Sequence, residues 1–459
     1  MQLKKEIIIA SHIKLKKMKI KNLLLASLAV AAMTACSNEE EFIDNGIQTP
    51  TGEQATMRVN FTSATGKSRA VSEEGKDAGS NEESAITTAT IVLDYGGNKL
   101  IVKNNLTVTN DNPNANQEVV ASTPAFSVAA GSNITIYAFV NPSDKLNAEI
   151  NAAKNTEDFK ALQIGAQALP GNGLDYLASS IAKDDNFLMS GSKGDITITA
   201  GTDENKATIN VDRVSAKLDE RTDSEKNFKI SESTYTVKGD KNWLVAKFVG
   251  HSYSNLVKDS YVLTNETNWT GAEPYLQVYK TDYRWIAAGI TYCLENKVGG
   301  DWTEETKAKA TNVHYQAQVY YATGSEENPT LEEAETFYVK VNPIYEDGNY
   351  VRDEKTIYKS WAEMRVDYNN LSETEGNAEY LAANGIIKYE DGLCYYEAAI
   401  QHAGQGCSII RNNWYQLAVN SVKDLGWPTS TPPTPESDTK LTITANIQPW
   451  TIHKNEIDL

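Results

Sequence analysis

Residues 441–459 read LTITANIQPWTIHKNEIDL, and this C-terminal stretch governs the interpretation of the whole chain. Apolar and polar residues alternate through its first eight positions. The apolar members are Leu441, Ile443, Ala445 and Ile447. A period of two predicts a β-strand with one buried face. Pro449 interrupts the alternation, so we expect Trp450 to face differently or to lie at a bulge.

A proline-rich arm precedes this strand, because residues 428–438 read PTSTPPTPESD. Proline cannot donate a hydrogen bond to a sheet and favours extended polyproline geometry. In that geometry the arm spans about 30 Å, enough to reach a neighbouring molecule. We assign residues 428–439 to the arm and 440–459 to the strand. Such a strand either folds back into its own domain or enters the groove of another molecule.

The bulk of the chain is predicted to be mainly β. Its 459 residues suggest two domains, and 23 tyrosines among alternating Thr, Val and Ile runs favour strands. We predict two β-sandwich domains of transthyretin-like or Greek-key type, at residues 70–225 and 226–427. Small helical insertions are expected, the largest at residues 143–169. The net charge of −18 argues against nucleic acid as a partner.

The N-terminus is typical of an exported lipoprotein. We assign residues 1–35 to a signal peptide whose true start is Met18, with a basic beginning and an apolar core at residues 23–32. The sequence Met-Thr-Ala-Cys that ends at Cys36 resembles a bacterial lipobox. An ordinary signal-peptidase site with an incidental cysteine is the alternative. The acidic residues 37–41 resemble the signal that sends lipoproteins of Bacteroidetes-type bacteria to the cell surface.

A second alternating run follows, with apolar residues at Ala55, Met57, Val59 and Phe61. Beyond it lies a basic segment of small residues that contains Arg69 and Ala70, and then a Gly/Ser/acid-rich stretch. A processing protease needs an extended, exposed backbone, which this composition can supply. We therefore predict cleavage between Arg69 and Ala70, within a lipidated propeptide of residues 36–69. Lys67 and Arg58 are competing basic positions.

Nothing in the sequence predicts an enzyme, a cofactor or a metal site. The five histidines are dispersed, and the four cysteines form no CxxC pair. Cys394 and Cys407 either pair or remain buried free thiols. The SxxK pattern from Ser190 to Lys193 has no accompanying KTG or SDN sequence and is expected in a glycine-rich turn.

The chain resembles a known family at several separated places. They are Arg411-Asn412-Asn413-Trp414-Tyr415, Leu425-Gly426-Trp427-Pro428 with the arm, Ile447-Gln448-Pro449-Trp450, Ile457-Asp458-Leu459 and the mid-chain Val211–Lys217. With the lipobox and the Arg69 segment, these motifs are similar to those of the Mfa1/FimA-like major fimbrial subunits of Bacteroidales. No single motif suffices, but the set is specific.

The resemblance implies a pilin that assembles by strand exchange. In that family an Arg-specific protease removes an N-terminal strand from an exported lipoprotein, and the opened groove accepts the C-terminal strand of the next subunit. Carried over, Cys36 is lipidated and the cut falls at Arg69–Ala70. Met57, Val59 and Phe61 belong to the removable strand, whereas the donor strand carries Leu441, Ile443, Ala445, Ile447 and Trp450.

The partners and the location also follow from the resemblance. The implied partners are other copies of the chain, accessory fimbrial subunits, the maturation protease and, through the precursor's lipid, the outer membrane. The implied location is a cell-surface fimbria that supports adhesion, colonisation and biofilm formation.

Two other interpretations remain open. The first is a monomeric surface lipoprotein that binds glycan or host protein through exposed aromatics. Its candidate platforms are Trp243, Trp285, Trp302, Trp361 and Trp414. The second is an anchor or minor subunit of the same fimbria. A binding module has no use for a removable N-terminal strand together with a C-terminal strand on a proline arm. Residues 411–413 either bind a ligand or, as we favour, hydrogen-bond a turn or strand edge.

Overall fold

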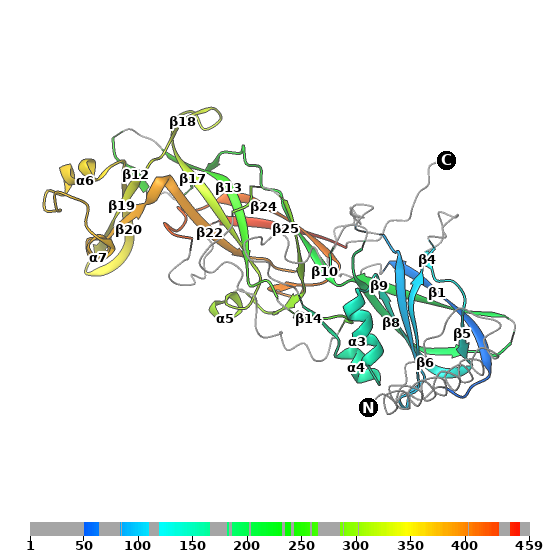
Figure 1. Ribbon diagram of the computed structural model, residues 1–459. Helices are drawn as coiled ribbons and strands as arrows, with labels where there is room; N and C mark the ends of the chain where they lie inside the picture. The colour runs from blue at the N-terminus through cyan, green and yellow to red at the C-terminus, as the bar shows by residue number, and fades with distance from the viewer. Residues whose placement is uncertain are drawn as a thin grey trace, which may run out of the picture. The chain divides into compact units, whose positions relative to one another are not determined.

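The structure is a computed structural model that describes most of the chain after residue 49. The described residues are 50–63, 83, 85–109, 119–165, 181–182, 186–201, 203–231, 235–239, 243–257, 259–264, 285–287, 289–301, 303–402, 404–430 and 441–449. Strands dominate them and the helices are short (Figure 1). The predicted mainly β fold is therefore confirmed. No helix among these residues is long and apolar enough to cross a membrane.

The first half of the described chain forms one eight-stranded path with the order β3-β2-β6-β8-β9-β1-β4, in which β5 also pairs with β1. The strands are β1 (Gln54–Ser63), β2 (Thr88–Asp94), β3 (Leu100–Thr107), β4 (Val119–Ser122), β5 (Phe126–Ala129), β6 (Gly131–Val140), β8 (Met189–Ile198) and β9 (Glu204–Arg213). β8 and β9 share only two ladder pairs, so the path divides there into two groups of strands. Apolar residues of both groups belong to one buried cluster, as in a β-sandwich.

The predicted helical insertion is shorter than residues 143–169. It consists of α3 (Asp144–Ala152) and α4 (Thr156–Lys160), and Gln163–Gly165 already forms strand β7. Ser143 caps α3 by accepting a hydrogen bond from the Leu146 backbone N–H. The apolar residues that suggested a longer helix, such as Phe159 and Leu162, are buried as expected. The helical period was correct locally, but it does not continue past Lys160.

The second half is built from smaller sheets. Their orders are β15-β10-β24-β25, β11-β13-β17-β18 with β22 on β17, β12-β20-β19-β21, β14-β7 and β16-β23. The strands are β10 (Ser215–Glu220), β11 (Phe228–Lys229), β12 (Tyr235–Val237), β13 (Trp243–Ser254), β14 (Asp259–Tyr261), β15 (Gly289–Leu294), β16 (Asn296–Lys297), β17 (Asn312–Gly324), β18 (Pro329–Glu333), β19 (Phe337–Glu346), β20 (Asn349–Tyr358), β21 (Ile386–Tyr389), β22 (Leu393–Ala399), β23 (Ser408–Ile409), β24 (Asn413–Val422) and β25 (Leu441–Pro449). The helices are α5 (Glu304–Lys307), α6 (Trp361–Asp367) and α7 (Ala378–Ala383).

The chain changes sheet between β9 and β10, across the single residue Val214. β9 belongs to the first path, whereas β10 pairs with β15 and β24. β7, from the first half, pairs with β14, from the second. One buried apolar cluster contains residues from both halves. The domains at residues 70–225 and 226–427 stay a prediction.

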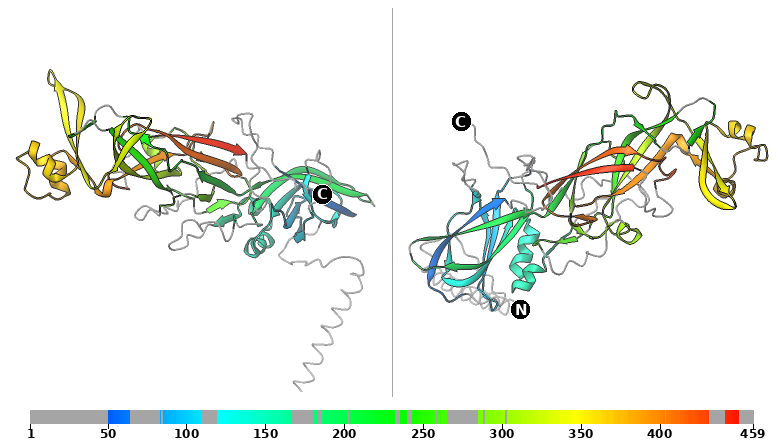
Figure 2. Two further views of the ribbon diagram at one scale, coloured as in Figure 1. Left: turned by 90° about the horizontal axis from the view of Figure 1, so that it is seen from above. Right: turned by 180° about the vertical axis from the view of Figure 1, so that it is seen from behind.

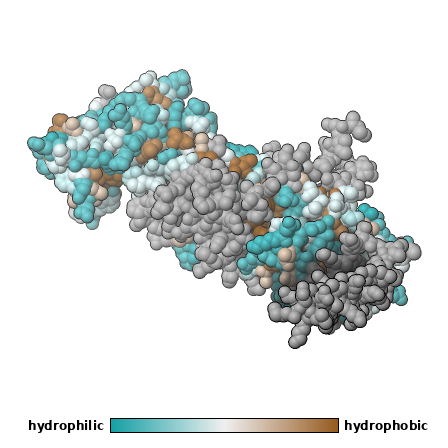
Figure 3. Space-filling view, viewed as in Figure 1, coloured by the Kyte–Doolittle hydropathy of each residue, from teal (hydrophilic) through white to brown (hydrophobic). Residues whose placement is uncertain are grey.

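The surface in Figure 3 is mostly hydrophilic where described residues are drawn, and its hydrophobic residues are scattered. Single exposed apolar residues are normal on soluble proteins. The hairpin of β19 and β20 carries three of them, Tyr345, Tyr350 and Val351, and the rings of the two tyrosines lie edge to face.

His251 on β13 is buried inside the second half. Its ring lies edge-on to Tyr253, with 5.4 Å between ring centroids. Neither ring nitrogen makes a well-formed hydrogen bond to the described residues, although the Ile286 backbone is near enough to favour the protonated form weakly. Burial outweighs this contact and lowers the pKa of His251 from 6.5 to about 4.

This lowered pKa predicts an acid-sensitive contribution to stability. Between pH 6.5 and about pH 4 the unfolded chain binds a proton at residue 251 that the folded chain does not, so folding stability falls as the pH falls. The loss reaches at most about 3 kcal/mol. We expect His251→Phe to lose less stability than the wild type between pH 7 and pH 4, as measured by urea unfolding. Parallel pH profiles for the two proteins would contradict the prediction.

Candidate assembly site

Strand β1 lies inside the first sheet and not at its edge (blue in Figure 1). One edge runs parallel to β9, from Thr56 opposite Glu204 to Ser63 opposite Val211. The other edge pairs antiparallel with β5 and then with β4. Its alternating apolar side chains are all buried, with 0 to 2% exposure: Ala55, Met57, Val59 and Phe61. If β1 were absent, a groove with two unpaired backbone edges and four apolar sites would be left.

Polar contacts hold β1 at its neighbours as well. The Arg58 guanidinium donates to Glu204 on β9, with 2.7 Å between Nε and Oε1, and also to the Thr123 carbonyl oxygen at 3.2 Å. The Thr123 hydroxyl accepts a hydrogen bond from the Val59 backbone N–H at 3.1 Å. The Arg58–Glu204 pair is partly exposed, so it stabilises the strand only slightly. The buried apolar side chains provide most of the attachment.

Strand β25 occupies a different position, at the edge of the sheet β15-β10-β24-β25. It pairs antiparallel with β24 of its own chain, as the right-hand view of Figure 2 shows. The backbone register sets Leu441, Ile443, Ala445 and Ile447 opposite Val422, Val419, Leu417 and Tyr415. Ile443 is half-buried against the apolar core. β25 therefore has one ladder partner among the described residues, whereas β1 has partners on both edges.

The segment that leads toward the arm is anchored to β22. Trp427 and Tyr395 exchange two backbone hydrogen bonds, of 2.9 and 2.7 Å. A Cβ atom on Gly426 would lie 2.5 Å from the Tyr395 carbonyl oxygen, so only glycine permits this approach. Leu425 is fully buried beside it. The described chain is thus fixed to β22 shortly before the arm.

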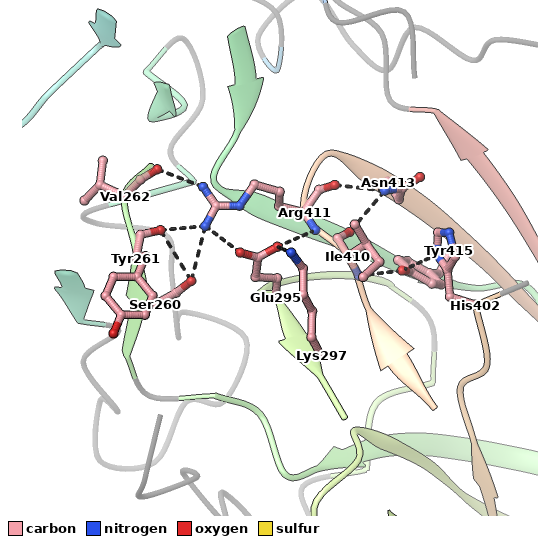
Figure 4. A network of polar contacts seen from close by, with 10 residues as sticks. All are labelled: Ser260, Tyr261, Val262, Glu295, Lys297, His402, Ile410, Arg411, Asn413 and Tyr415. Atoms are coloured by element: carbon pink, nitrogen blue, oxygen red, sulfur yellow. Dashed lines mark hydrogen bonds and ion pairs between the residues drawn. The ribbon is translucent and has the colours of Figure 1, made fainter. Parts of the chain in front are cut away.

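A buried polar network holds the beginning of β24 (Figure 4). Arg411 donates to Glu295, with 2.7 Å between Nη2 and Oε1, and both side chains are at most 3% exposed. Its guanidinium also donates to the backbone oxygens of Tyr261 and Val262, at 2.5 and 2.8 Å. The Asn413 side chain donates to the Arg411 carbonyl oxygen at 2.8 Å. These contacts confirm that residues 411–413 stabilise a turn and a strand edge.

The network continues along β24 to Tyr415. The Tyr415 hydroxyl accepts a hydrogen bond from the Ile410 backbone N–H at 2.7 Å and lies 2.9 Å from Nδ1 of His402. Burial raises the pKa of Tyr415 well above its usual value and lowers that of His402, so both groups are held neutral at pH 7. Hydrogen bonds therefore fix the first residues of β24, the strand that pairs with β25.

Several predicted site residues lie outside the described residues: Cys36, Arg69, Ala70 and Trp450. Met57, Val59 and Phe61 lie on β1, while Leu441, Ile443, Ala445 and Ile447 lie on β25. Their roles in strand removal and donation stay predictions. Sequence reasoning did not identify Glu295, whose partner Arg411 is 116 residues away along the chain.

The candidate tryptophans within the described residues are all at least partly buried. Trp414 is buried, whereas Trp243, Trp285 and Trp361 are half-buried; Trp302 lies outside the described residues. Lys217 and Arg221 both lie over the Trp414 ring, and its indole N–H donates to Asp219.

No chemistry is evident at the other candidate positions. Ser190 lies within strand β8 and not in the expected glycine-rich turn, and its hydroxyl donates to the Val262 carbonyl oxygen. Cys394 and Cys407 are both buried and do not form a disulfide, in line with one of the two alternatives from the sequence. No group of three or more His, Cys, Asp or Glu side chains in the described ranges is arranged to hold a metal ion.

The Arg411–Glu295 pair yields a stability prediction. Glu295→Leu leaves the Arg411 guanidinium buried without its carboxylate, which we expect to cost about 3–5 kcal/mol of unfolding free energy. The double variant Glu295→Leu/Arg411→Met should recover most of that loss, because both charges of the pair are then removed together. Denaturant unfolding measures both effects. The exposed pair of Lys229 and Glu326 is the control, and Glu326→Leu should change stability by less than about 1 kcal/mol.

One protein-family model matches the C-terminal part of the chain. Residues 387–456, which include β24, the arm and β25, match the family described as major fimbrial subunit protein type IV, fimbrillin, C-terminal. No curated protein matches the chain significantly.

Solved structures give weaker likenesses. A candidate cell adhesion protein from Parabacteroides distasonis is 13% identical, with 88% of this chain and 100% of that chain covered and a TM-score of 0.48. A fimbrilin from Porphyromonas gingivalis is 17% identical (87% and 98% covered, TM-score 0.43). The tip fimbrial protein Mfa3 of the same species is 13% identical (86% and 100% covered, TM-score 0.38).

The family match concerns the C-terminal part of the chain. That match covers the arm, the C-terminal strand and the strand that holds it. Residues 387–456 carry the fimbrillin C-terminal pattern, which confirms the resemblance of this chain to fimbrial subunits of the Mfa1/FimA-like group.

Proposed function

We propose that this protein is a structural subunit of a cell-surface fimbria and polymerises by protease-triggered donor-strand exchange. The observation that carries the proposal is the position of β1, which fills the interior of a sheet with four buried alternating side chains. β1 also precedes the predicted cut at Arg69–Ala70, so cleavage there would separate it from the rest of the chain.

The two strands match in pattern and in length. β1 has ten residues and β25 has nine, and each presents four apolar residues at every second position. Burying four such side chains contributes roughly 5–10 kcal/mol before ordering costs. A β25 strand from a neighbour could therefore replace the apolar contacts of β1. Backbone ladder bonds would then set its register.

The difference in position supplies a direction for the exchange. At the edge of its own sheet, β25 has one ladder partner among the described residues, whereas the groove of β1 offers partners on both edges, β9 on one and β4 with β5 on the other. A strand that moves from such an edge to the interior of a sheet gains backbone hydrogen bonds and apolar burial. Cleavage is the step that makes the groove available, because an intact β1 is tethered to it.

In this proposal the precursor is exported as a lipoprotein through Cys36 and reaches the cell surface. An Arg-specific protease matures it, and its partners are further copies of itself and accessory fimbrial subunits. Adhesion, colonisation and biofilm formation are the functions of the resulting fibre.

One observation favours the monomeric lipoprotein as a second candidate. β25 is paired with β24 of its own chain, which is also how a strand that never leaves its domain would be placed. In the assembly proposal this pairing is the resting state of the precursor. The two candidates differ in whether β25 leaves β24 once β1 has been cut free.

The test is cleavage of residues 37–459 with an Arg-specific protease, followed by mass spectrometry and size analysis. We expect cleavage near Arg69 to produce SDS-resistant ladders or filaments, because exchanged strands are buried on both edges. Arg69→Ala should reduce both cleavage and polymerisation, and a chain truncated before Lys440 should be cleaved but stay monomeric.

A matched pair of substitutions on β25 tests the side chains that are exchanged. Ile443→Asp should stop polymerisation without affecting cleavage, because it would bury a carboxylate in the groove. Thr442→Asp, at the neighbouring position of opposite phase, should polymerise nearly as the wild type does. If the wild type is cut and remains monomeric, β25 belongs to its own sheet and the monomeric lipoprotein becomes the leading interpretation.

A further inference from the structure

Glu83 is a buried carboxylate between the predicted cut and strand β2. Its side chain is 3% exposed and forms an ion pair with Lys217 on β10, with 2.7 Å between Oε1 and Nζ. The Tyr292 hydroxyl on β15 donates to the same carboxylate oxygen. Lys217 is itself 4% exposed, so both charges of the pair lie in the interior.

The backbone of Glu83 is held by a third buried group. Its carbonyl oxygen accepts a hydrogen bond from Nε of Arg213 at 2.8 Å. Arg213 is fully buried, and burial lowers its pKa to about 9. It is the last residue of β9, the strand that runs beside β1. The contact therefore lies at the end of the groove that β1 fills.

The same residues reach the sheet that holds β25. Tyr292, Lys217 and Trp414 face one another in register across β15, β10 and β24, and the Trp414 backbone pairs with that of Gln448 on β25. Arg213 also donates to the side-chain oxygen of Asn412, which precedes β24. Glu83 thus contacts Arg213 at the end of the β1 groove and also Lys217, which lies in register with Trp414 and, through it, with β25.

Downstream of Glu83 the chain is held again before β2. The Asn141 side chain donates to the Ala85 carbonyl oxygen at 2.8 Å and accepts from the backbone N–H groups of Thr87 and Thr88 at 3.0 and 3.2 Å. β2 then pairs with β3 and β6. Glu83 is therefore the first described contact after the predicted cut, and Asn141 makes the next one.

We propose that Glu83 is a positioning residue that anchors the chain downstream of the cut, so that detachment of β1 does not loosen β2. The inference rests on the proposed function, in which the chain is cut after Arg69. In the intact chain, β1 and Glu83 both restrain the segment that leads into β2. Once the cut separates β1, the chain begins at Ala70, and among the described residues Glu83 is the first to hold it, ahead of Asn141.

The chemistry of the contact suits this role. A buried ion pair with an added tyrosine hydrogen bond is specific in geometry, and removal of one partner leaves an uncompensated buried charge. Arg213 donates to the main chain of Glu83 and Lys217 pairs with its carboxylate, so this residue is held at two points. Neither contact involves β1, so both persist when β1 departs.

The test of the Glu83 anchor uses an engineered cleavage site, so that its result does not depend on cleavage at Arg69. Residues 64–69 are replaced by the recognition sequence of a protease with unrelated specificity, and the protein is cut there. Amide hydrogen exchange of peptides covering residues 85–94 is measured by mass spectrometry before and after the cut. The proteins compared are the parent with this site, Glu83→Gln, Lys217→Met and the control Glu375→Ala, which breaks the distant ion pair with Lys388.

In the parent and in Glu375→Ala we expect exchange over residues 85–94 to change little on cutting. In Glu83→Gln and Lys217→Met we expect it to rise about tenfold or more after the cut, which corresponds to about 1.4 kcal/mol of opening free energy. Before the cut, the same variants should show a smaller rise in exchange, because β1 still restrains the segment. Lys217→Met breaks the same contact from β10, so the test does not depend on a single variant.

Two results would overturn the proposal. The first is equal exchange in all cut proteins. The second is an equal rise in the uncut variants, which would show that the pair stabilises the fold irrespective of the cut. The engineered site makes this outcome independent of Arg69. If the anchor effect is present but the native cut never yields polymers, the anchor stands and strand exchange fails.

Discussion

The pairing of β1 on both edges is the constraint on which the first half of the structure depends. Backbone N–H and C=O groups inside a sheet need hydrogen-bond partners, and here β1 supplies them to β9 on one side and to β4 and β5 on the other. Met57, Val59 and Phe61 also fill the core beneath the sheet. Loss of this interior strand would leave two unpaired backbone edges and an open core, and the strand exchange proposed above depends on that requirement.

In the second half the strand of interest, β25, lies at a sheet edge and depends on a single neighbour, β24. Buried charges and hydroxyl groups fix the beginning of β24 through Arg411, Glu295 and Tyr415. Polar groups in a low-dielectric interior specify one geometry, since any other leaves a donor or a charge unpaired. β25 then adds its backbone to a strand whose position is already set. If β25 departed, these contacts at the beginning of β24 would remain, because none of them involves β25.

The predictions from sequence succeeded where the signal was local. The alternating runs at β1, β6, β24 and β25 are strands, and α6 and α7 lie where the sequence left short helices or loops as the two alternatives. The β18 and β20 strands were not predicted. β20 reads NYVRDEKTIY, in which charged residues occur in both phases of the alternation. Residues 349–352 at its beginning are exposed in the structure, so the sequence shows no alternating apolar face there. The SxxK pattern misled for a related reason, because its glycines suggested a turn where β8 continues.

By itself, the sequence determined the strand periods, the proline arm and the fimbrillin-like C-terminal pattern, because each is encoded in neighbouring residues. Only the tertiary structure decided which strands pair. It placed β1 inside one sheet and β25 at the edge of another, although both carry four alternating apolar residues. It also brought Glu83, Arg213, Lys217 and Tyr292 together from positions up to 209 residues apart. Such contacts depend on how the sheets pack, and no local period records them.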